Sequence, residues 1–429
     1  MEDLIMQSPV NLDTPSPDPG AEGDAPGIID QATQRRYRIF KKNSPFLYDY
    51  MSTNSLLWPS LSVQFFPDLE VADANPPIGI GHDRSGAPSS DIASSAKTTG
   101  PSKAQSNSEL AHQRLLLGTF TLGQAVDAIH LYQVPYYRNL NKCINTDHWT
   151  YNSEKEEFEL PTIAKTKLRS LQSINHNGDV NKLRYMPQNP DIIASSNNVG
   201  DLCVYNRTKH STIKKLGEES KVNEPQLRLV NSAYVQNADI FALDWNKQAE
   251  SVLVSASMDG QINVFDIRGN YATRAGPDNS INQTWCTEHG VGVNDVEWIY
   301  KHDSIFLTAD DAGGISVFDT RSSATANSGY SGVAPECQND LGTPGCDYPG
   351  EMAPEIHSCL DPLRPDRSVR IFDVADPQEP LLFSHEGHML GVNDFDWSLH
   401  EDWMVASVAD DNSLHLWKPA HHVVKKVYT

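Results

Sequence analysis

The chain has 429 residues, of which 38% are hydrophobic, and its 56 acidic and 34 basic side chains give a formal net charge of −22. No stretch approaches the roughly 20 apolar residues that a membrane helix needs, and the first residues lack the basic and apolar regions of a secretion signal. Direct binding to a phosphate backbone needs a basic footprint, so the charge argues against a nucleic-acid binder and favours basic partners. An acidic surface also serves solubility alone, and charge does not separate these two interpretations.

The six cysteines are scattered without a Cys-x-x-Cys pair. This pattern is typical of reduced thiols in the nucleus or cytosol, and it argues against a zinc ribbon or a disulfide framework. We therefore expect no metal and no cofactor.

The N-terminal part divides into a tail and a helix. Residues 1–30 carry seven acidic side chains, several prolines and no Lys or Arg, which predicts a disordered tail. The domain 31–56 is predicted to be helical from about Gln31 to Met51, because apolar residues recur there at helical spacing, with a kink at Pro45. Its basic first half fits either a localisation signal or a solvated helix face.

Two later segments have loop-like composition. Residues 71–109 are rich in Ser, Ala, Gly, Pro and Asp, which predicts a flexible insertion. Residues 322–366 hold no run of aliphatic residues, no Trp and three of the six cysteines, which predicts an irregular segment.

From about residue 115 the chain repeats itself, and the repeat decides the fold. Each block runs through short segments that alternate apolar and polar residues, as β-strands do, separated by turn sequences such as Asp259-Gly260. The blocks begin at His176, Asp239, His289 and Gly387, and the repeat ends at Asn206, Asp266, Asp319 and Asp373 are 60, 53 and 54 residues apart. Repeats of about 40–45 residues plus loops, with a leading Gly-His and a closing Trp-Asp-like pair, are typical of WD40 proteins. We predict an all-β fold, a WD40 β-propeller over residues 57–429.

Histidines and tryptophans of these blocks are expected to be structural. In a propeller, His289 and His388 brace strands by hydrogen bonds rather than acting as catalytic or metal-binding groups. Core positions are expected for Trp245, Trp298, Trp397 and Trp417. The sequence holds no nucleophile elbow, P-loop or His-Glu-x-x-His motif, so we expect no enzymatic activity. A ubiquitin-ligase receptor would need a docking segment such as an F-box, and none is visible.

Several motifs closely resemble the MSI/RbAp family of histone-binding WD40 proteins. They are the block Leu57-Trp-Pro-Ser-Leu61 after the helix, Arg184 to Ile193, and Asn206 to His210. The segments from His388 and from Leu416 are most similar to the fungal branch, which serves as the small subunit of chromatin assembly factor 1. The resemblance covers about residues 31–70, 110–320 and 368–420. It implies a seven-bladed propeller with the N-terminal helix on its side, and a ring closed by residues 61–66 pairing within the last blade.

The resemblance also implies the function. The chain is expected to be a non-catalytic subunit that binds histones H3 and H4, partners the larger subunits of chromatin assembly factor 1, and acts as a histone chaperone in the nucleus, with the cytoplasm as a second location. It is expected to bind no nucleic acid directly and no membrane. The alternative is an accessory subunit of a type B histone acetyltransferase or a histone deacetylase complex.

The family binds the first helix of histone H4 between the N-terminal helix and an acidic loop. Matching positions are Phe46, Leu47, Asp376, Glu379 and Phe383. Apolar anchors would bury the face of the guest helix, and carboxylates would pair with its Lys and Arg. The alternative role for the first two residues is to pack the helix onto the propeller.

The family's second histone surface is the face around the central channel, which takes basic peptides such as the H3 tail. Matching positions are Asp179, Asn181, Asp239, Phe241 and Asn294. We expect both aspartates to be exposed at the channel mouth, where carboxylates bind Lys or Arg by charge-assisted hydrogen bonds. Turn and cap hydrogen bonding is the alternative role of these residues.

The repeat has a defect. Asp319 and His388 are 69 residues apart. In this interval the family has two blades, which together need roughly 80–90 residues. Only Ser368 to Asp373 resembles blade sequence in this interval. We therefore expect five well-formed blades plus an incomplete one, rather than seven. The cause is either degeneration of a blade or a faulty gene model; an open ring exposes strand edges, which favours the second.

Overall fold

The structure is a computed structural model, and it describes most of the chain outside three long segments. The described residues are 30–71, 109–138, 150–153, 157–159, 168–212, 220–229, 239–268, 281–287, 290–321, 332–333, 367–372 and 381–424. Nearly all of the predicted tail, of the insertion 71–109 and of the irregular segment 322–366 therefore lies outside the described residues. No helix in the described ranges is both long and apolar enough to span a membrane.

Helix α1 (Gln31–Leu47) is shorter than predicted. Asp30 caps it by accepting a hydrogen bond from the Thr33 N–H at 2.7 Å. Pro45 lies in the last turn and cannot donate to the Lys41 carbonyl, which instead accepts from the Ser44 hydroxyl at 3.0 Å. The chain then becomes extended, so the helix ends at Leu47 and not near Met51.

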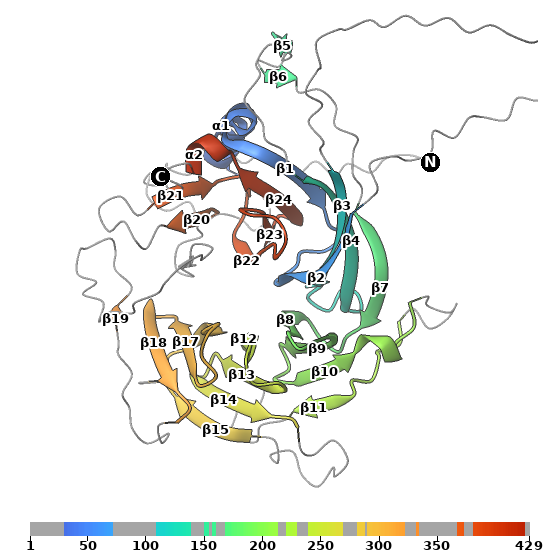
Figure 1. Ribbon diagram of the computed structural model, residues 1–429, viewed down its shortest axis with the longest axis vertical. Coiled ribbons are helices and arrows are strands. Elements are labelled where there is room, and N and C mark those ends of the chain that lie inside the picture. The colour runs from blue at the N-terminus through green and yellow to red at the C-terminus, as the bar shows by residue number, and fades with distance from the viewer. Residues whose placement is uncertain are drawn as a thin grey trace, which may run out of the picture.

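Five four-stranded antiparallel sheets are arranged around a centre as the blades of a propeller (Figure 1). The first blade contains β2 (Val63–Val71), β3 (Glu109–Gly118), β4 (Ala128–Arg138) and β7 (Arg169–Asn175). The second contains β8 (Val180–Met186), β9 (Asn189–Asn197), β10 (Leu202–Asn206) and β11 (Leu227–Leu229). The third contains β12 (Ile240–Trp245), β13 (Val252–Ser257), β14 (Gln261–Asp266) and β15 (Ile281–Cys286). The fourth contains β16 (Val293–Trp298), β17 (Ile305–Asp310), β18 (Gly314–Asp319) and β19 (Gly332–Val333).

The last blade combines the two ends of the chain. It contains β22 (Val392–Trp397), β23 (Val405–Ala409), β24 (Ser413–Pro419) and, on its outer edge, β1 (Tyr48–Ser55). The prediction that N-terminal sequence closes the ring is thus confirmed, but the predicted strand is wrong. Of residues 61–66, the last four are the beginning of β2, the innermost strand of the first blade. Residues 61–66 and β1 both alternate apolar and polar residues, so the sequence does not decide which of them pairs with the last blade. The structure decides it, because Met51 of β1 pairs with Trp417.

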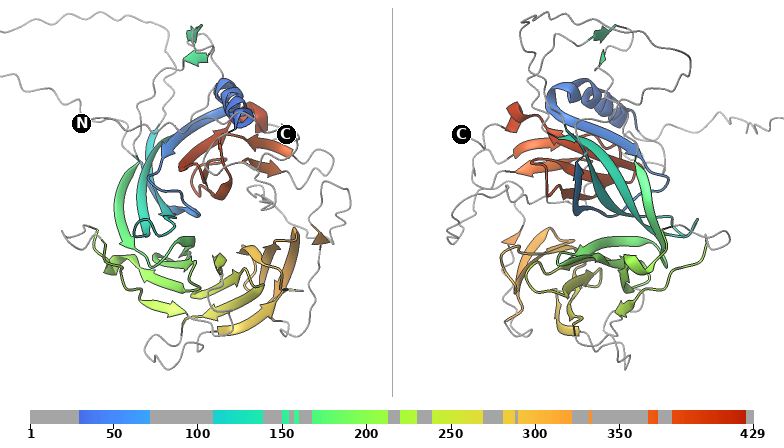
Figure 2. Two further views of the ribbon diagram at one scale, coloured as in Figure 1. Left: turned by 180° about the vertical axis from the view of Figure 1, so that it is seen from behind. Right: turned by 45° about the vertical axis from the view of Figure 1, so that its right-hand side comes forward.

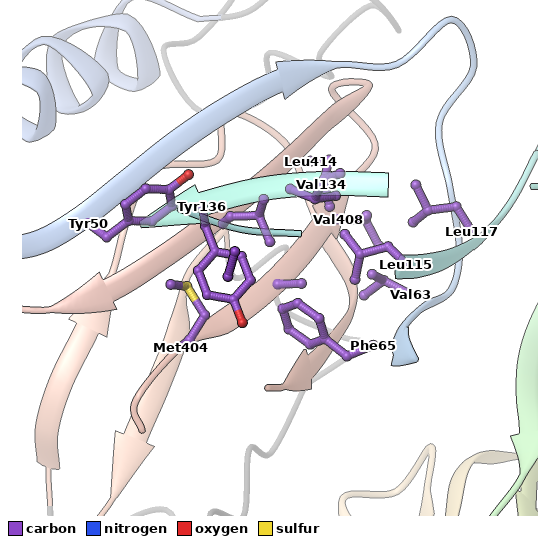
Figure 3. Close-up of a cluster of buried hydrophobic side chains, with 13 residues drawn as sticks. Tyr50, Val63, Phe65, Leu115, Leu117, Val134, Tyr136, Met404, Val408 and Leu414 are labelled. Atoms are coloured by element: carbon purple, nitrogen blue, oxygen red, sulfur yellow. The ribbon is translucent and has the colours of Figure 1, made fainter. Parts of the chain in front are cut away.

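A hydrophobic seam joins the first and last blades (Figure 3). Its side chains come from β2, β3 and β4 of the first blade and from β1, Met404, β23 and β24 of the last blade. Val63, Leu115 and Leu414 are all fully buried there. Burial of an aliphatic side chain contributes about 1.5–3 kcal/mol, so the seam holds together the two blades between which the chain passes from β1 to β2.

A two-stranded sheet stands where a sixth blade would lie. It contains β20 (Val369–Phe372) and β21 (Leu381–His385), and it packs on the last blade through Val369, Ile371 and Phe383. Five complete blades plus an incomplete one confirm that prediction for the described residues. The remaining short elements are the hairpin β5 (Thr150–Asn152) with β6 (Glu157–Glu159), the 3-10 helix η2 (Arg207–Lys209) and the helix α2 (His421–Val424).

A buried carboxylate connects three inner strands near the axis. Asp394 on β22 accepts from Lys182 Nζ at 3.2 Å and from Arg184 Nη1 at 3.1 Å, both on β8, and from the Val63 N–H of β2 at 2.9 Å. Asp394 is 4% exposed and Lys182 6%. Burial alone raises a carboxyl pKa, but these two cations hold the pKa of Asp394 at about 2. The pKa of its neighbour Asp396 is raised to about 7, mainly by burial.

We predict that Asp394→Asn lowers the free energy of unfolding by about 3–5 kcal/mol, because it removes the buried anion that Lys182 and Arg184 share and leaves Lys182 with only the more exposed Asp295. Asp191→Asn is the matched control, since the Asp191–Arg207 pair is more exposed, at 38% and 23% of the two side chains, and should cost no more than about 1 kcal/mol. Urea unfolding of both variants measures the difference. Equal losses of unfolding free energy in the two variants would contradict the prediction that Asp394 stabilises the fold more than an exposed ion pair does.

Candidate functional site

Helix α1 packs on a group of aromatic rings from both ends of the chain, which we call the seat of α1. Tyr48 is 5% exposed, and its hydroxyl lies 2.7 Å from His385 Nδ1. Phe40 of α1 stands edge-on to the His385 ring with centroids 5.6 Å apart. A Cβ on Gly387 would lie 2.8 Å from both Phe40 and His385, so only glycine lets the helix approach this closely. The helix lies beside β1 and the last blade in both views of Figure 2.

The structure places three of the five residues predicted for the H4 helix near this seat. Leu47 packs on the cluster around Trp417, and its carbonyl accepts from the Ala420 N–H at 2.8 Å, so it holds the helix on the propeller. Phe383 is 5% exposed and lies edge-on to Tyr48 at 5.2 Å, which makes it a support of the seat and not a surface group. Phe46 is half-buried at the end of α1. Asp376 and Glu379 lie outside the described residues.

A cluster of three buried histidines lies under the seat. His385 Nε2 is 3.1 Å from His415 Nδ1, and His388 bonds to Ser413 Oγ at 2.8 Å and to Ser407 Oγ at 2.7 Å. The expected bracing role is confirmed for His388; His289 lies outside the described residues. Trp245, Trp298 and Trp417 are at most 1% exposed, as predicted for core residues, and Trp397 is half-buried.

The ring nitrogens of the three histidines lie within 4.8 Å of one another, as metal ligands do. The geometry does not suit a metal, however. His388 uses both ring nitrogens in hydrogen bonds, and it stacks on His415 at 4.0 Å with an interplanar angle of 14°. Lone pairs in parallel planes do not converge on one ion. The arrangement is a hydrogen-bond network that joins β1, β21 and β24.

The face around the axis is built differently from the predicted ring of exposed carboxylates. Asp179 is 4% exposed. Its carboxylate accepts from the Thr121 N–H at 3.2 Å, the Leu122 N–H at 3.0 Å and Asn198 Nδ2 at 2.8 Å. The expectation that Asp179 is exposed is wrong, because this carboxylate fixes the turns of two neighbouring blades.

The other predicted residues of this face vary in exposure. Asn181 is buried and donates to the Ile240 carbonyl at 3.3 Å. Asp239, Phe241 and Asn294 are half-buried. The pKa of Asp239 is raised, first by burial and then by the charge of Asp179.

Sequence reasoning missed two features of this region. Lys182 and Arg184 neutralise acidic groups near the axis, and Lys182 Nζ lies 3.2 Å from both Asp394 and Asp295. Their position on a predicted inner strand is the only signal in the sequence. The second feature is a set of apolar side chains on turns, such as Leu122, which is 67% exposed.

Comparison with known proteins agrees with this architecture. Residues 35–138, which include most of α1, β1 and the first blade up to β4, match a family model whose description names the histone-binding protein RBBP4 and a subunit of the CAF1 complex. Residues 379–418 match "WD domain, G-beta repeat". The chain is 29% identical to "Histone-binding protein MSI1" of Saccharomyces cerevisiae, over 91% of this chain and 95% of that protein.

The chain is thus similar to the histone-binding WD40 proteins of the MSI/RbAp family. The family's seven blades are not reached among the described residues, where five complete blades and one two-stranded sheet are found.

We predict that the protein loses stability as the pH falls below about 6.5. Burial, and next the neighbouring histidine charges, lower the pKa of His385 and His415 well below the ordinary 6.5. Between pH 5 and 6 the unfolded chain therefore binds protons at these two histidines that the folded cluster does not bind, so their contribution to stability is complete only above this range. It outweighs the opposite contribution of Asp396, whose raised pKa gives the folded chain one additional proton in this window. Each of the two histidines should contribute about 1.4 kcal/mol per pH unit between pH 5 and 6.

Urea unfolding of the wild type, His385→Gln and Tyr48→Phe over pH 5–7.5 tests this. His385→Gln should reduce the slope by about one proton. Tyr48→Phe removes only the hydroxyl partner, so it should lower stability at every pH and keep the slope. Identical slopes in all three proteins would contradict the assignment.

Proposed function

We propose that this protein is a non-catalytic subunit of a chromatin assembly complex of the chromatin assembly factor 1 type, which holds histones H3 and H4 for nucleosome assembly in the nucleus. The match of residues 35–138 carries the proposal, because the matched description names both a histone-binding protein and a component of that complex. The yeast relative is likewise described as histone-binding.

The physical character of the chain supports this role. A net charge of −22 favours basic partners such as histones and disfavours naked DNA. The sequence lacks the catalytic motifs that we searched for, and the histidines of the buried cluster are engaged in hydrogen bonds. Both observations support a scaffold over an enzyme. Accessory roles in an acetyltransferase or deacetylase complex would use the same histone surfaces, and only co-purified partners distinguish them.

The protein should bind an H3–H4 complex and not naked DNA. Much of the attraction is between unlike charges, so affinity should fall as salt rises. Calorimetry with H3–H4 at several salt concentrations, beside a gel shift with naked DNA, measures both properties. Co-purification from nuclear extract with mass spectrometry then identifies the complex. Tight DNA binding without histone binding would overturn the proposal.

Phe46→Ala should weaken binding of a peptide with the first-helix sequence of H4 by about 10- to 100-fold, if Phe46 is an interface anchor. Leu47→Ala is the control, because Leu47 packs on the core and its truncation should cost about 2–4 kcal/mol of stability. A thermal melt beside each binding curve separates the two effects. If Phe46→Ala melts early and keeps its affinity, Phe46 is packing and not a contact.

A further inference from the structure

Three neighbouring blades expose an apolar side chain at the same turn. The turn between the second and third strands of a blade carries Leu122 in the first blade, Val199 in the second and Met258 in the third, with 67%, 46% and 36% of each residue exposed. We call these three residues the apolar arc. Single exposed apolar residues are ordinary, but a repeated position on three adjacent blades forms a surface. The three blades lie side by side in Figure 1.

Hydrogen bonds connect the apolar arc to the acidic pair of the channel face. Leu122 N–H donates to Asp179 at 3.0 Å, and Asn198, which precedes Val199, donates to the same carboxylate at 2.8 Å. Met258 N–H donates to the carbonyl of Asp239 at 3.0 Å. The arc therefore borders both Asp179 and Asp239.

Leu122 adopts a backbone conformation that does not suit it. Its φ is +51°, in the left-handed region that favours glycine, and the adjacent Gly123 has φ +73°. The bond to Asp179 holds the turn in place. A leucine that is strained and two-thirds exposed contributes little to folding, and such outliers point to a functional constraint.

The two remaining complete blades carry no large apolar residue at this turn. Asp311 begins the turn of the fourth blade, and Asp410 and Asp411 begin that of the last blade. Asp410 is exposed and Asp311 is half-exposed. Acidic residues also belong to this turn in the second and third blades, as Asp201 and Asp259, so the apolar arc is an addition to an acidic face.

We propose that this face binds an extended peptide that alternates aliphatic and basic side chains, with its aliphatic groups on Leu122, Val199 and Met258 and its Lys or Arg on Asp239, Asp311 and Asp410. The proposal rests on the proposed function and specifies which basic segments the channel face selects. Charge complementarity argues for this partner: nucleic acid and a second copy of this chain, with its −22 charge, would both be repelled. The acids alone would accept any basic peptide, whereas the apolar arc adds selection by shape and hydrophobicity.

Leu122→Gly tests the inference without harming the fold. Glycine is the residue that φ +51° prefers, so the melting temperature should hold or rise. Ser251→Gly is the matched control, because Ser251 also has positive φ, at +64°, but lies in the turn between the first and second strands of its blade, at the opposite face. Val199→Ser is a second, independent variant.

Two 12-residue synthetic peptides serve as probes. Both carry four lysines, and one carries four leucines where the other carries four serines. Fluorescence anisotropy should show the wild type and Ser251→Gly binding the leucine peptide at least fivefold more tightly. Leu122→Gly and Val199→Ser should reduce this preference to below twofold, with unchanged affinity for the serine peptide. Equal binding of both peptides by the wild type, no binding of either, or a preference that survives in both variants would overturn the inference.

H3–H4 binding measured on the same proteins separates the two proposals. Wild-type protein that prefers the leucine peptide but ignores H3–H4 would overturn the proposed function and keep the surface. Histone binding that is intact in wild type, without any peptide preference, would overturn the surface alone.

Discussion

The carboxylate of Asp394 is the constraint around which the described structure is organised. It lies in the interior, and it is tolerable there only because Lys182 and Arg184 approach it from a different blade and the backbone of β2 donates to it. Three inner strands are thereby held at fixed separations. The same contacts neutralise acidic groups near the axis, so the acidic character that a basic partner would meet is left to the turns on the face.

The last blade supports both candidate binding regions. Its outer edge is β1, and the aromatic seat that follows from this pairing positions α1. Its inner strand β22 supplies Asp394, and its turn supplies Asp410. A disturbance of this blade would therefore reach the helix seat and the channel face together, whereas changes at the apolar arc remain confined to the first three blades.

The repeats made most of the fold predictable. The blocks at Val180, Ile240, Val293 and Val392 do begin the inner strands β8, β12, β16 and β22, because alternation and period agree there. The first part of the strand Tyr48–Ser55 is wrongly predicted as helix, since Tyr48 and Met51 also fit helical spacing and only the distant β24 decides between the two.

The candidate site was less predictable than the fold. An aspartate before an inner strand has the same sequence signature whether it points to solvent or, like Asp179, accepts three hydrogen bonds from turns. The pairing of Lys182 with Asp394 joins residues far apart in sequence, so no local pattern contains it. Exposed Leu122 escapes sequence reasoning because apolar residues are assigned to the core by default.

The pairing of β1 with β24 has a consequence for the synthesis of the protein. Tyr48 to Ser55 is synthesised long before its partner Ser413 to Pro419. Until β24 has been synthesised, β1 is an unpaired strand with exposed apolar side chains, which favours aggregation. Contacts of such long sequence separation also form slowly. Helix α1 therefore has no complete seat until β24 has been synthesised. A product truncated before β24 would contain the helix sequence and yet lack the surface on which that helix packs.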